Sequence, residues 1–175
     1  MTERSKRQLI LILIPLLCII LDQGSKVVAR QRLIGAPARE LLSGTLRIEY
    51  TENPGAFLSL GANLPSEARF VIFTVFVVAL LIGLVAFALR MPEDTPMAVV
   101  VAIALVIGGG VSNLIDRLVN DGRVADFMQL GVGPLHTGVF NVADVAIMGG
   151  LALMLVALVW PGKRDSNPQP DVGTE

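Results

Sequence analysis

The sequence has little charge, few aromatic residues and almost no cysteine or histidine. Charged residues make up 17% of the chain and aromatic residues 5%, and there are one cysteine and one histidine among 175 residues. A single cysteine excludes an internal disulfide. A formal net charge of −1 provides no excess of positive charge for nucleic acid, so we expect no nucleic-acid partner.

Apolar residues are what the chain has in excess, and they come in long runs. Hydrophobic residues make up 53% of the chain, and the mean hydropathy is +0.68. A helix needs ~20 mostly apolar residues to cross a membrane, and four segments reach that length, at about 9–29, 70–89, 97–119 and 139–160. We therefore predict an all-α membrane protein with four transmembrane helices in one integral-membrane domain, 1–162, and a disordered cytoplasmic tail, 163–175.

The two longer connections between these helices, 30–69 and 120–138, share the face opposite the termini. Each contains a segment in which apolar and polar residues alternate, "TLRIEYTE" in the first and "GRVADFMQLGV" in the second, which predicts strands. We expect them to form a small β-sheet cap. Basic residues that flank the first and last helices favour cytoplasmic termini and thus an extracytoplasmic cap; they are Arg4, Lys6, Arg7, Lys163 and Arg164.

The N-terminal stretch has the basic start and apolar run of a signal peptide, but we expect it to be retained as the first membrane helix. No small-x-small cleavage site follows it, and the helical pattern continues through Val27–Ala29. Cys18 follows two leucines, whereas lipid-modified cysteines usually follow small residues. Cys18 is therefore predicted to be a small buried apolar side chain.

Polar residues within the apolar segments gather toward the ends that face the two longer loops. They form three pairs, each on one helix face by its three- or four-residue spacing: Asp22 and Lys26, Asn113 and Arg117, and Asn141 and Asp144. A charge at the centre of a membrane helix costs ~2.5–3.5 kcal/mol on insertion scales. Asp144 is five residues into a helix expected to begin at 139, which is ~7–8 Å along its axis. This predicts a polar site at the membrane edge, whereas carriers tend to hold their ions near the midplane.

Asp126, in "RVADF", follows the third helix closely enough to fold back over this cluster and approach Asp144. Two carboxylates in a poorly hydrated site cannot easily both be charged, so the pair shares a proton. One carboxylate can then activate water while its protonated partner polarises a carbonyl. That is the chemistry of aspartic peptide hydrolysis.

Other chemistries have weaker support. The only histidine, His136, is not part of an HExxH motif, so zinc hydrolysis is not favoured and we expect His136 to be a loop residue and not a metal ligand. A Ser/Lys pair remains open, since Lys26 is the only lysine within the apolar segments and Ser25 or Ser112 could serve as nucleophile.

Non-catalytic roles also remain open for the cluster. The charged residues of the first and third helices, above all Lys26 and Asp116, are more simply explained as ion pairs that hold the helices together. The whole cluster could also belong to a small transporter, or to a membrane protein that binds lipidated peptides without cutting them. A loop carboxylate such as Asp126 would be of little use to a carrier, which argues against transport.

Five motifs occur in the same order as in the bacterial lipoprotein signal peptidases. They are "LDQGSK", "ENPGAF", "GGGVSNLIDR", "ADF" and "FNVAD". The chain thus resembles the signal peptidase II family over residues 21–144. The resemblance implies an aspartic endopeptidase of the bacterial cytoplasmic membrane that needs no metal or cofactor. Its substrates would be diacylglyceryl prolipoproteins in the membrane lipid, cut just before the lipidated cysteine, and cyclic peptides such as globomycin would inhibit it.

The same resemblance implies roles for individual residues. The catalytic aspartates correspond to Asp126 and Asp144. The substrate-binding or site-supporting residues correspond to Asp22, Lys26, Asn53, Gly109, Asn113, Arg117 and Asn141. The chain departs from the family pattern in its loop, "NPGAFLSLG", and at Ser112 and Ala125. Independently of the family, the glycines at 108–110 and 149–150 are most simply explained by close helix contact.

Overall fold

The computed structural model describes residues 2–55 and 63–159. Within them, four helical segments are long and apolar enough to cross a membrane. They are α1 (Glu3–Leu33); α2 (Ser66–Phe70), which continues through a π-helical turn (Val71–Phe76) into α3 (Val77–Leu89); α4 (Met97–Val119); and α5 (Val142–Val159). The predicted tail, 163–175, lies outside the described residues, so the division into one domain and a tail stays a prediction.

The helices differ from the predicted segments mainly at their ends. The first helix extends past 9–29 at both ends, because Thr2 caps it by accepting a hydrogen bond from the Ser5 N–H at 3.2 Å and because its polar C-terminal turns remain helical. The last helix begins at Val142 instead of 139. Hydropathy marks the stretch of chain that suits lipid, whereas caps decide where a helix begins and ends.

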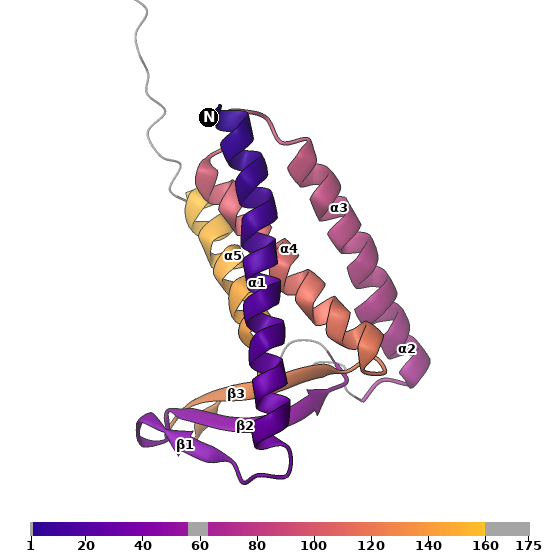
Figure 1. Cartoon of the computed structure of the whole chain (residues 1–175), viewed down its shortest axis with the longest axis vertical. Coiled ribbons are helices and arrows are strands. Elements are labelled where there is room, and N and C mark those ends of the chain that lie inside the picture. The colour runs from indigo at the N-terminus through magenta and orange to yellow at the C-terminus, as the bar shows by residue number, and fades with distance from the viewer. Residues whose placement is uncertain (1, 56–62, 160–175) are drawn as a thin grey trace, which may run out of the picture.

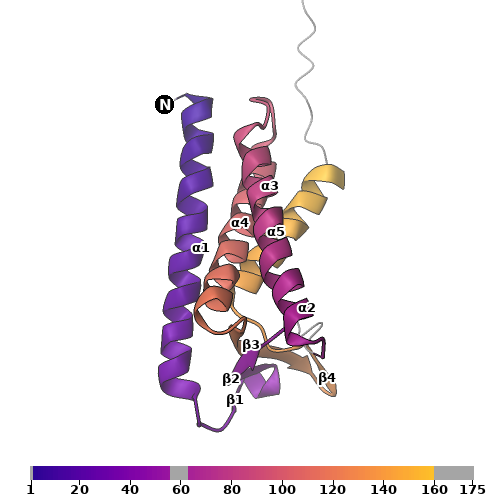
Figure 2. The same ribbon diagram turned by 90° about the vertical axis from the view of Figure 1, so that its right-hand side faces the viewer.

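Helix α4 lies at the centre of the bundle, between α1 on one side and α3 and α5 on the other (Figure 2). Over half of its most apolar stretch, 56%, is buried, against 12–17% for the other three spans. Three consecutive glycines make this possible, since a Cβ at each would overlap a neighbour: Gly108 on Pro15 and Cys18 of α1, Gly109 on Ala143 of α5, and Gly110 on Leu81 of α3. Gly150 meets α4 in the same way, whereas nothing lies near Gly149.

A four-stranded antiparallel sheet lies across the helix ends that are opposite the N-terminus (Figure 1). Its strands, in spatial order, are β1 (Arg39–Leu41), β2 (Leu46–Asn53), β3 (Val124–Val132) and β4 (Leu135–His136). The sheet comes from the two longer loops, as predicted. The alternating segments became β2 and β3, while the short outer strands were not predicted, and exposed His136 lies in β4 instead of a loop.

A sharp turn brings β3 back beneath α4. Asp121 and Gly122 adopt left-handed backbone conformations with φ of 51° and 80°, and the Gly122 N–H donates to the Arg117 carbonyl at 2.9 Å. The hydrogen bond satisfies a carbonyl at the helix end, and glycine adopts this conformation at little cost. β3 therefore starts at Val124, directly under the polar end of α4.

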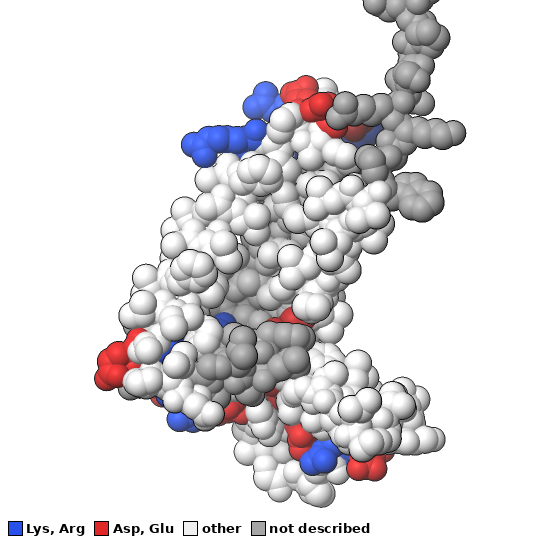
Figure 3. Space-filling model, turned by 180° about the vertical axis from the view of Figure 1, so that it is seen from behind, with Lys and Arg blue, Asp and Glu red and all other residues white. Residues whose placement is uncertain are grey.

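The surface agrees with a chain that spans a membrane several times. Figure 3 shows charged side chains at the two ends of the molecule and a middle band that is almost free of them. Large apolar side chains of the membrane-spanning helices are exposed, among them Ile12, Leu16, Leu80, Ile82 and Leu155. The protein is a multi-pass membrane protein, because in water such a surface would be unfavourable.

Candidate active site

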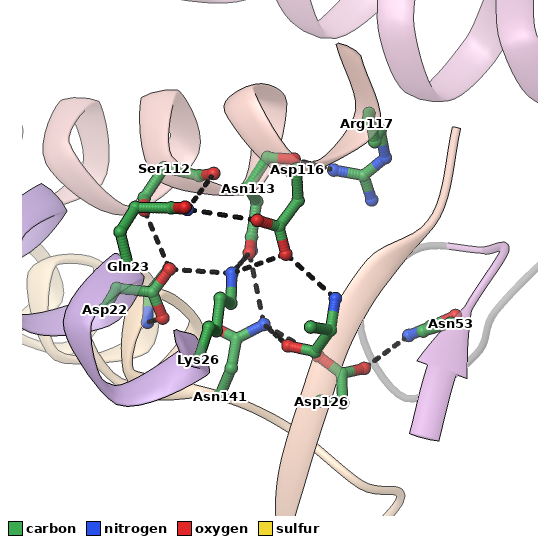
Figure 4. A network of polar contacts seen from close by, with 12 residues as sticks. Asp22, Gln23, Lys26, Asn53, Ser112, Asn113, Asp116, Arg117, Asp126 and Asn141 are labelled. Carbon is green, nitrogen blue, oxygen red and sulfur yellow. Dashed lines mark hydrogen bonds and ion pairs between the residues drawn. The ribbon is translucent and has the colours of Figure 1, made fainter. Parts of the chain in front are cut away.

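Asp126 lies on β3 beneath the helices and is 1% exposed. Its two carboxylate oxygens accept hydrogen bonds from different elements. Oδ2 accepts from Asn53 Nδ2 of β2 at 2.9 Å, and Oδ1 accepts from Asn141 Nδ2 at 2.7 Å. Register explains the first contact: Asp126 pairs with Thr51, so Asn53 is its diagonal neighbour on the same sheet face. Figure 4 shows Asp126 between these two side chains.

Burial makes Asp126 a weaker acid than an ordinary aspartate. Removal of its carboxylate from water raises its pKa to about 7, and the neighbouring Asp144 acts in the same direction. The hydrogen bonds from Asn53 and Asn141 oppose this rise without cancelling it. Near neutral pH, Asp126 can therefore either hold or release a proton.

Asp144 is held by the start of its own helix. Asn141 Oδ1 accepts the Asp144 N–H at 2.9 Å, and Asp144 Oδ2 accepts the Asn141 N–H at 3.2 Å. This reciprocal capping explains why α5 begins directly after Asn141. Asp144 is the third residue of α5, only ~3 Å along the axis from Val142. It is thus even closer to the helix end than the predicted ~7–8 Å.

Asn141 and Asn113 join the two carboxylates. Asn141 contacts Asp126 through its side chain and Asp144 through its backbone, as above, and is fully buried. Asn113 Nδ2 of α4 donates to Asp144 Oδ1 at 2.9 Å, and Asn113 Oδ1 accepts from Asn141 Nδ2 at 3.1 Å. The two acids from separate elements are therefore linked through two asparagines.

Lys26 lies behind these asparagines, 1% exposed, on the inner face of α1. Its ammonium forms ion pairs with Asp22 at 2.7 Å and Asp116 at 3.1 Å, and it donates to Asn113 Oδ1 at 3.0 Å. All three N–H donors of the lysine thus have acceptors. The predicted ion pairing of Lys26 with Asp22 and Asp116 is confirmed.

The two aspartates of this ion cluster also hold the elements that carry the acids. Asp22 Oδ1 accepts the Ala143 N–H at the start of α5 at 2.8 Å. Asp116 Oδ2 accepts the Ala125 N–H at 2.8 Å, which fixes β3 one residue before Asp126. Sequence reasoning missed these anchors, because a backbone N–H on a distant segment leaves no signal in residue spacing.

Two supporting side chains were also missed or misjudged. Gln23 Nε2 lies within 3.1–3.2 Å of Ser112 and of Asp116 Oδ1. Ser112 donates to Asp22 Oδ2 at 2.7 Å. One sequence signal could have identified Gln23: it is a polar residue next to Asp22 inside an apolar helix, where polar side chains are rare and usually have a role.

Arg117 forms no ion pair among the described residues, so the ion pairing considered for the charged residues of the first and third helices does not extend to it. Instead its Nη1 donates to the Asn113 carbonyl at 3.2 Å and its Nη2 to the Gly55 carbonyl at 3.0 Å, while Nε is buried without a partner. It thereby connects α4 to the chain that follows β2. A cavity of about 340 Å³ lies beside it, lined also by Pro54 and Thr74.

Most of the residues predicted for the site belong to one connected network. Contacts of 2.7–3.2 Å link Asp22, Lys26, Asn53, Asn113, Asp126, Asn141 and Asp144. Arg117 contacts this network through the Asn113 backbone, and Gly109 contributes only close packing against α5. Their roles in catalysis and binding stay predictions.

The alternative chemistries lose support from this geometry. Ser25 donates to the Asp22 carbonyl of its own helix, and Ser112 donates to a carboxylate, so neither hydroxyl points to Lys26. Lys26 itself contacts Asp22, Asp116 and Asn113 Oδ1, and neither serine hydroxyl is among its partners. Among the described residues, no group of three His, Cys, Asp or Glu side chains is arranged to hold a metal ion.

Four membrane helices with two linked aspartates buried at one end define a multi-pass membrane protein with a site of the aspartic-peptidase type. The profile of the signal peptidase (SPase) II family matches residues 14–160. The chain belongs to the signal peptidase II family and is an aspartic peptidase.

Individual relatives agree. A lipoprotein signal peptidase of Syntrophus aciditrophicus is 33% identical over 162 residues, which cover 92% of this chain and 99% of the relative. One of Geobacter sulfurreducens is 35% identical over 146 residues, covering 83% and 89%. A bacterial membrane enzyme solved by the in meso method at 2.3 Å resolution superposes with a TM-score of 0.72 at 25% identity and 94% coverage of both chains.

Proposed function

We propose that this chain removes the signal peptide from diacylglyceryl-modified prolipoproteins, with Asp126 and Asp144 as its catalytic pair. The observation that carries the proposal is the single residue Asn141, which hydrogen-bonds to both buried acids at 2.7 and 3.2 Å. Family membership supports the substrate class, since the relatives above are lipoprotein signal peptidases.

In the proposed mechanism the pair holds one proton, and Asp126 carries it in the resting enzyme. Its pKa of about 7 supports this assignment. Asp144 lies in the first turn of α5, where the helix dipole and the N–H groups of Asn113 and Asn141 stabilise a carboxylate. Asp144 would remove a proton from water that attacks the scissile carbonyl, while Asp126 donates its proton toward the carbonyl oxygen.

Arg117 and Asn53 would position the peptide. Both lie where the chain leaves β2, and Arg117 holds the Gly55 carbonyl while the Gly55 N–H donates to Asn53 Oδ1 at 2.9 Å. The adjacent cavity beside Pro54 and Thr74 could take part of the substrate. The altered loop motif "NPGAFLSLG" falls largely on residues 56–62, outside the described residues.

The position of the acids suits a lipid-anchored substrate. Asp144 is in the first turn of a membrane helix and Asp126 is in the sheet below it, so the pair lies at a membrane edge. Acyl chains keep a lipidated cysteine at that depth, and each buried CH₂ contributes ~0.8 kcal/mol to membrane binding. A catalytic pair at the membrane edge would therefore lie close to the peptide bond just before the lipidated cysteine.

Cleavage of a purified substrate tests this function. A diacylglyceryl prolipoprotein incubated with the chain in detergent should give the shortened product on a gel, and the unlipidated form should be cut far more slowly. Asp126→Asn and Asp144→Asn should each abolish the product, because an amide cannot exchange the proton. Asp94→Asn, an exposed aspartate at the opposite end of the bundle, is the matched control. Binding of the lipidated peptide without any product would overturn the proposal.

We further propose that the chain lies in the bacterial cytoplasmic membrane with cytoplasmic termini and an extracytoplasmic sheet. Arg4, Lys6 and Arg7 at the terminal end support this orientation. In a Cys18→Ala background, a membrane-impermeant thiol reagent added to intact cells should label Gly133→Cys in the β3–β4 turn and not Asp94→Cys in the α3–α4 turn. The opposite labelling would reverse the orientation.

Cyclic peptide inhibitors such as globomycin are proposed to occupy the same site. A cyclic peptide can present a carbonyl to Asp126 and Asp144 while its apolar groups remain in the membrane. Globomycin should therefore inhibit cleavage in competition with the lipidated substrate. Inhibition that no concentration of substrate relieves would place it elsewhere.

A further inference from the structure

A second cavity lies at the other end of the bundle from the aspartates, between the start of α1 and the end of α3. Its volume is about 330 Å³. Figure 1 shows that the N-terminal turns of α1 and the α3–α4 turn are at the same end of the molecule, far from the sheet. The peptidase site uses none of its lining residues.

The mouth of this cavity is rich in positive charge. Arg4 and Arg7 of α1 line it together with Arg90, which follows α3, against one carboxylate, that of Glu93. Within the part of the chain that the structure describes, none of the three arginines forms an ion pair. The cavity therefore has an excess of guanidinium groups, which suits an anionic ligand.

Arg7 gives the cavity a fixed wall. Its Nη1 donates to the Pro92 carbonyl at 2.6 Å and its Nη2 to the Thr95 carbonyl at 2.5 Å, so it ties α1 to the α3–α4 turn. Both acceptors are neutral, so its positive charge is not compensated, and Nε is buried without a partner. The outer guanidiniums of Arg4 and Arg90 are exposed, and Arg90 makes only a long contact of 3.5 Å with the Ala86 carbonyl.

Below the arginines the lining becomes apolar, with Leu11 of α1 and Ala88 and Leu89 of α3. Leu89 is 76% exposed on a face that belongs to a membrane span. A free phosphate or an acidic peptide would have no use for this apolar portion. A lipid would, because its phosphate lies at the end of membrane helices and its acyl chains lie beside them.

We propose that this groove is a binding site for one anionic phospholipid of the phosphatidylglycerol type. The phosphodiester would lie between Arg4 and Arg90, near Arg7, and an acyl chain would follow Leu11 and Leu89. A lipid with net negative charge is preferred over a zwitterionic one, because the positively charged choline group of the latter would be repelled by the same guanidinium groups.

Native mass spectrometry of the full-length protein in detergent tests the site. With dioleoyl phosphatidylglycerol and dioleoyl phosphatidylcholine at equal concentrations, the protein should retain one phosphatidylglycerol with about tenfold preference. Arg4→Gln with Arg90→Gln should abolish the preference. The matched control, Arg32→Gln with Arg39→Gln, removes two exposed arginines at the sheet end and should leave the preference intact. Unfolding in lipid-free detergent checks that both double variants are folded.

A variant that removes negative charge from the groove, and should therefore increase lipid retention, keeps the test valid if the arginine variants do not fold. Glu93→Gln removes the only carboxylate among the described residues that line the groove, so retention of phosphatidylglycerol should increase. Equal retention of the two lipids by the unaltered protein, or loss of the preference in the sheet-end control, would overturn the proposal. So would equally effective competition by soluble glycerol 3-phosphate, because the site would then bind phosphate alone.

Discussion

Asn141 donates a hydrogen bond from its side-chain amide to the Asp126 carboxylate over 2.7 Å, although Asp126 lies on β3 and Asn141 directly precedes α5. The same residue caps α5 and contacts Asp144 through its backbone. One asparagine therefore sets both the start of a membrane helix and the position of the strand carboxylate relative to it. The separation of the two acids depends on this residue more than on any direct contact between them.

Replacement of Asn141 should therefore impair catalysis more than folding. Asn141→Ala keeps the backbone bond to Asp144 but removes the side-chain bonds to Asp126, to Asn113 Oδ1 and from the Asp144 N–H. Each is worth ~0.5–1.5 kcal/mol, so we expect the cleavage rate to fall about 10–100-fold. Gln129→Ala, on the same strand as Asp126 but bonded to the Thr137 carbonyl, should leave the rate unchanged. Rates with lipidated substrate under saturation test this, and an Asn141→Ala enzyme with a normal rate would exclude a positioning role.

Activity should decline on the alkaline side of neutrality. Asp126 has a pKa of about 7, and the mechanism needs its proton, so the rate should fall as that proton is lost above pH 7. An acid limb should appear where the second carboxylate is protonated, which gives a bell-shaped profile whose limbs belong to the pair. Cleavage rates in detergent from pH 4 to 9, with folding checked at each pH, test this. A rate that stays constant into alkaline pH would require a different mechanism.

The same acid should make stability depend on pH. A carboxyl whose pKa is higher in the folded state than in the unfolded chain favours folding while protonated, and that contribution is lost as pH rises from about 4 to about 7. Asp126→Asn cannot ionise, so its melting temperature relative to the unaltered protein should rise between pH 5 and 8. A difference in melting temperature that stays constant from pH 5 to 8 would contradict this linkage.

Replacement of Lys26 alone should destabilise the protein more than its replacement together with Asp22 and Asp116. Lys26→Met leaves the buried Asp22 and Asp116 without a counter-charge, which should cost roughly 3–5 kcal/mol. Adding Asp22→Asn and Asp116→Asn removes the uncompensated charges, so part of the stability should return. Thermal or denaturant unfolding in detergent tests this. A triple variant less stable than Lys26→Met would show that the charges are not the cause.

Arg117→Lys should reduce activity although it preserves the charge. An ammonium cannot span the Asn113 and Gly55 carbonyls as the guanidinium does, so the chain after β2 should be held less firmly. We expect kcat/KM to fall about tenfold, in line with the loss of one charged hydrogen bond. Arg47→Lys, in a partly exposed pair with Glu49 on β2, is the control and should behave normally. Equal kinetics for both would mean that only the charge of Arg117 matters.

The sequence by itself determined the membrane-spanning part of the fold. Runs of ~20 apolar residues have few alternatives to a membrane helix, and alternation over 46–53 and 124–132 is typical of strands with one covered face. The four-residue spacing of Asp22 and Lys26 was sufficient to predict their ion pair, since residues four apart on a helix are neighbours. The start of α5 is also encoded locally, because Asn141 and Asp144 have capping-box spacing.

Only the tertiary structure decided which polar groups meet across elements. The contact of Asp116 with the Ala125 N–H, of Asp22 with the Ala143 N–H, and of Arg117 with the Gly55 carbonyl each joins segments that local periodicity does not relate. The physical reason is that a buried polar group must find its hydrogen-bond partner wherever packing brings one. Here the glycines of α4 bring α1 and α5 so close that carboxylates on one element reach backbone groups on another. Spacing along the chain can place an acid on a helix face, but the partner that orients it depends on how closely the helices approach.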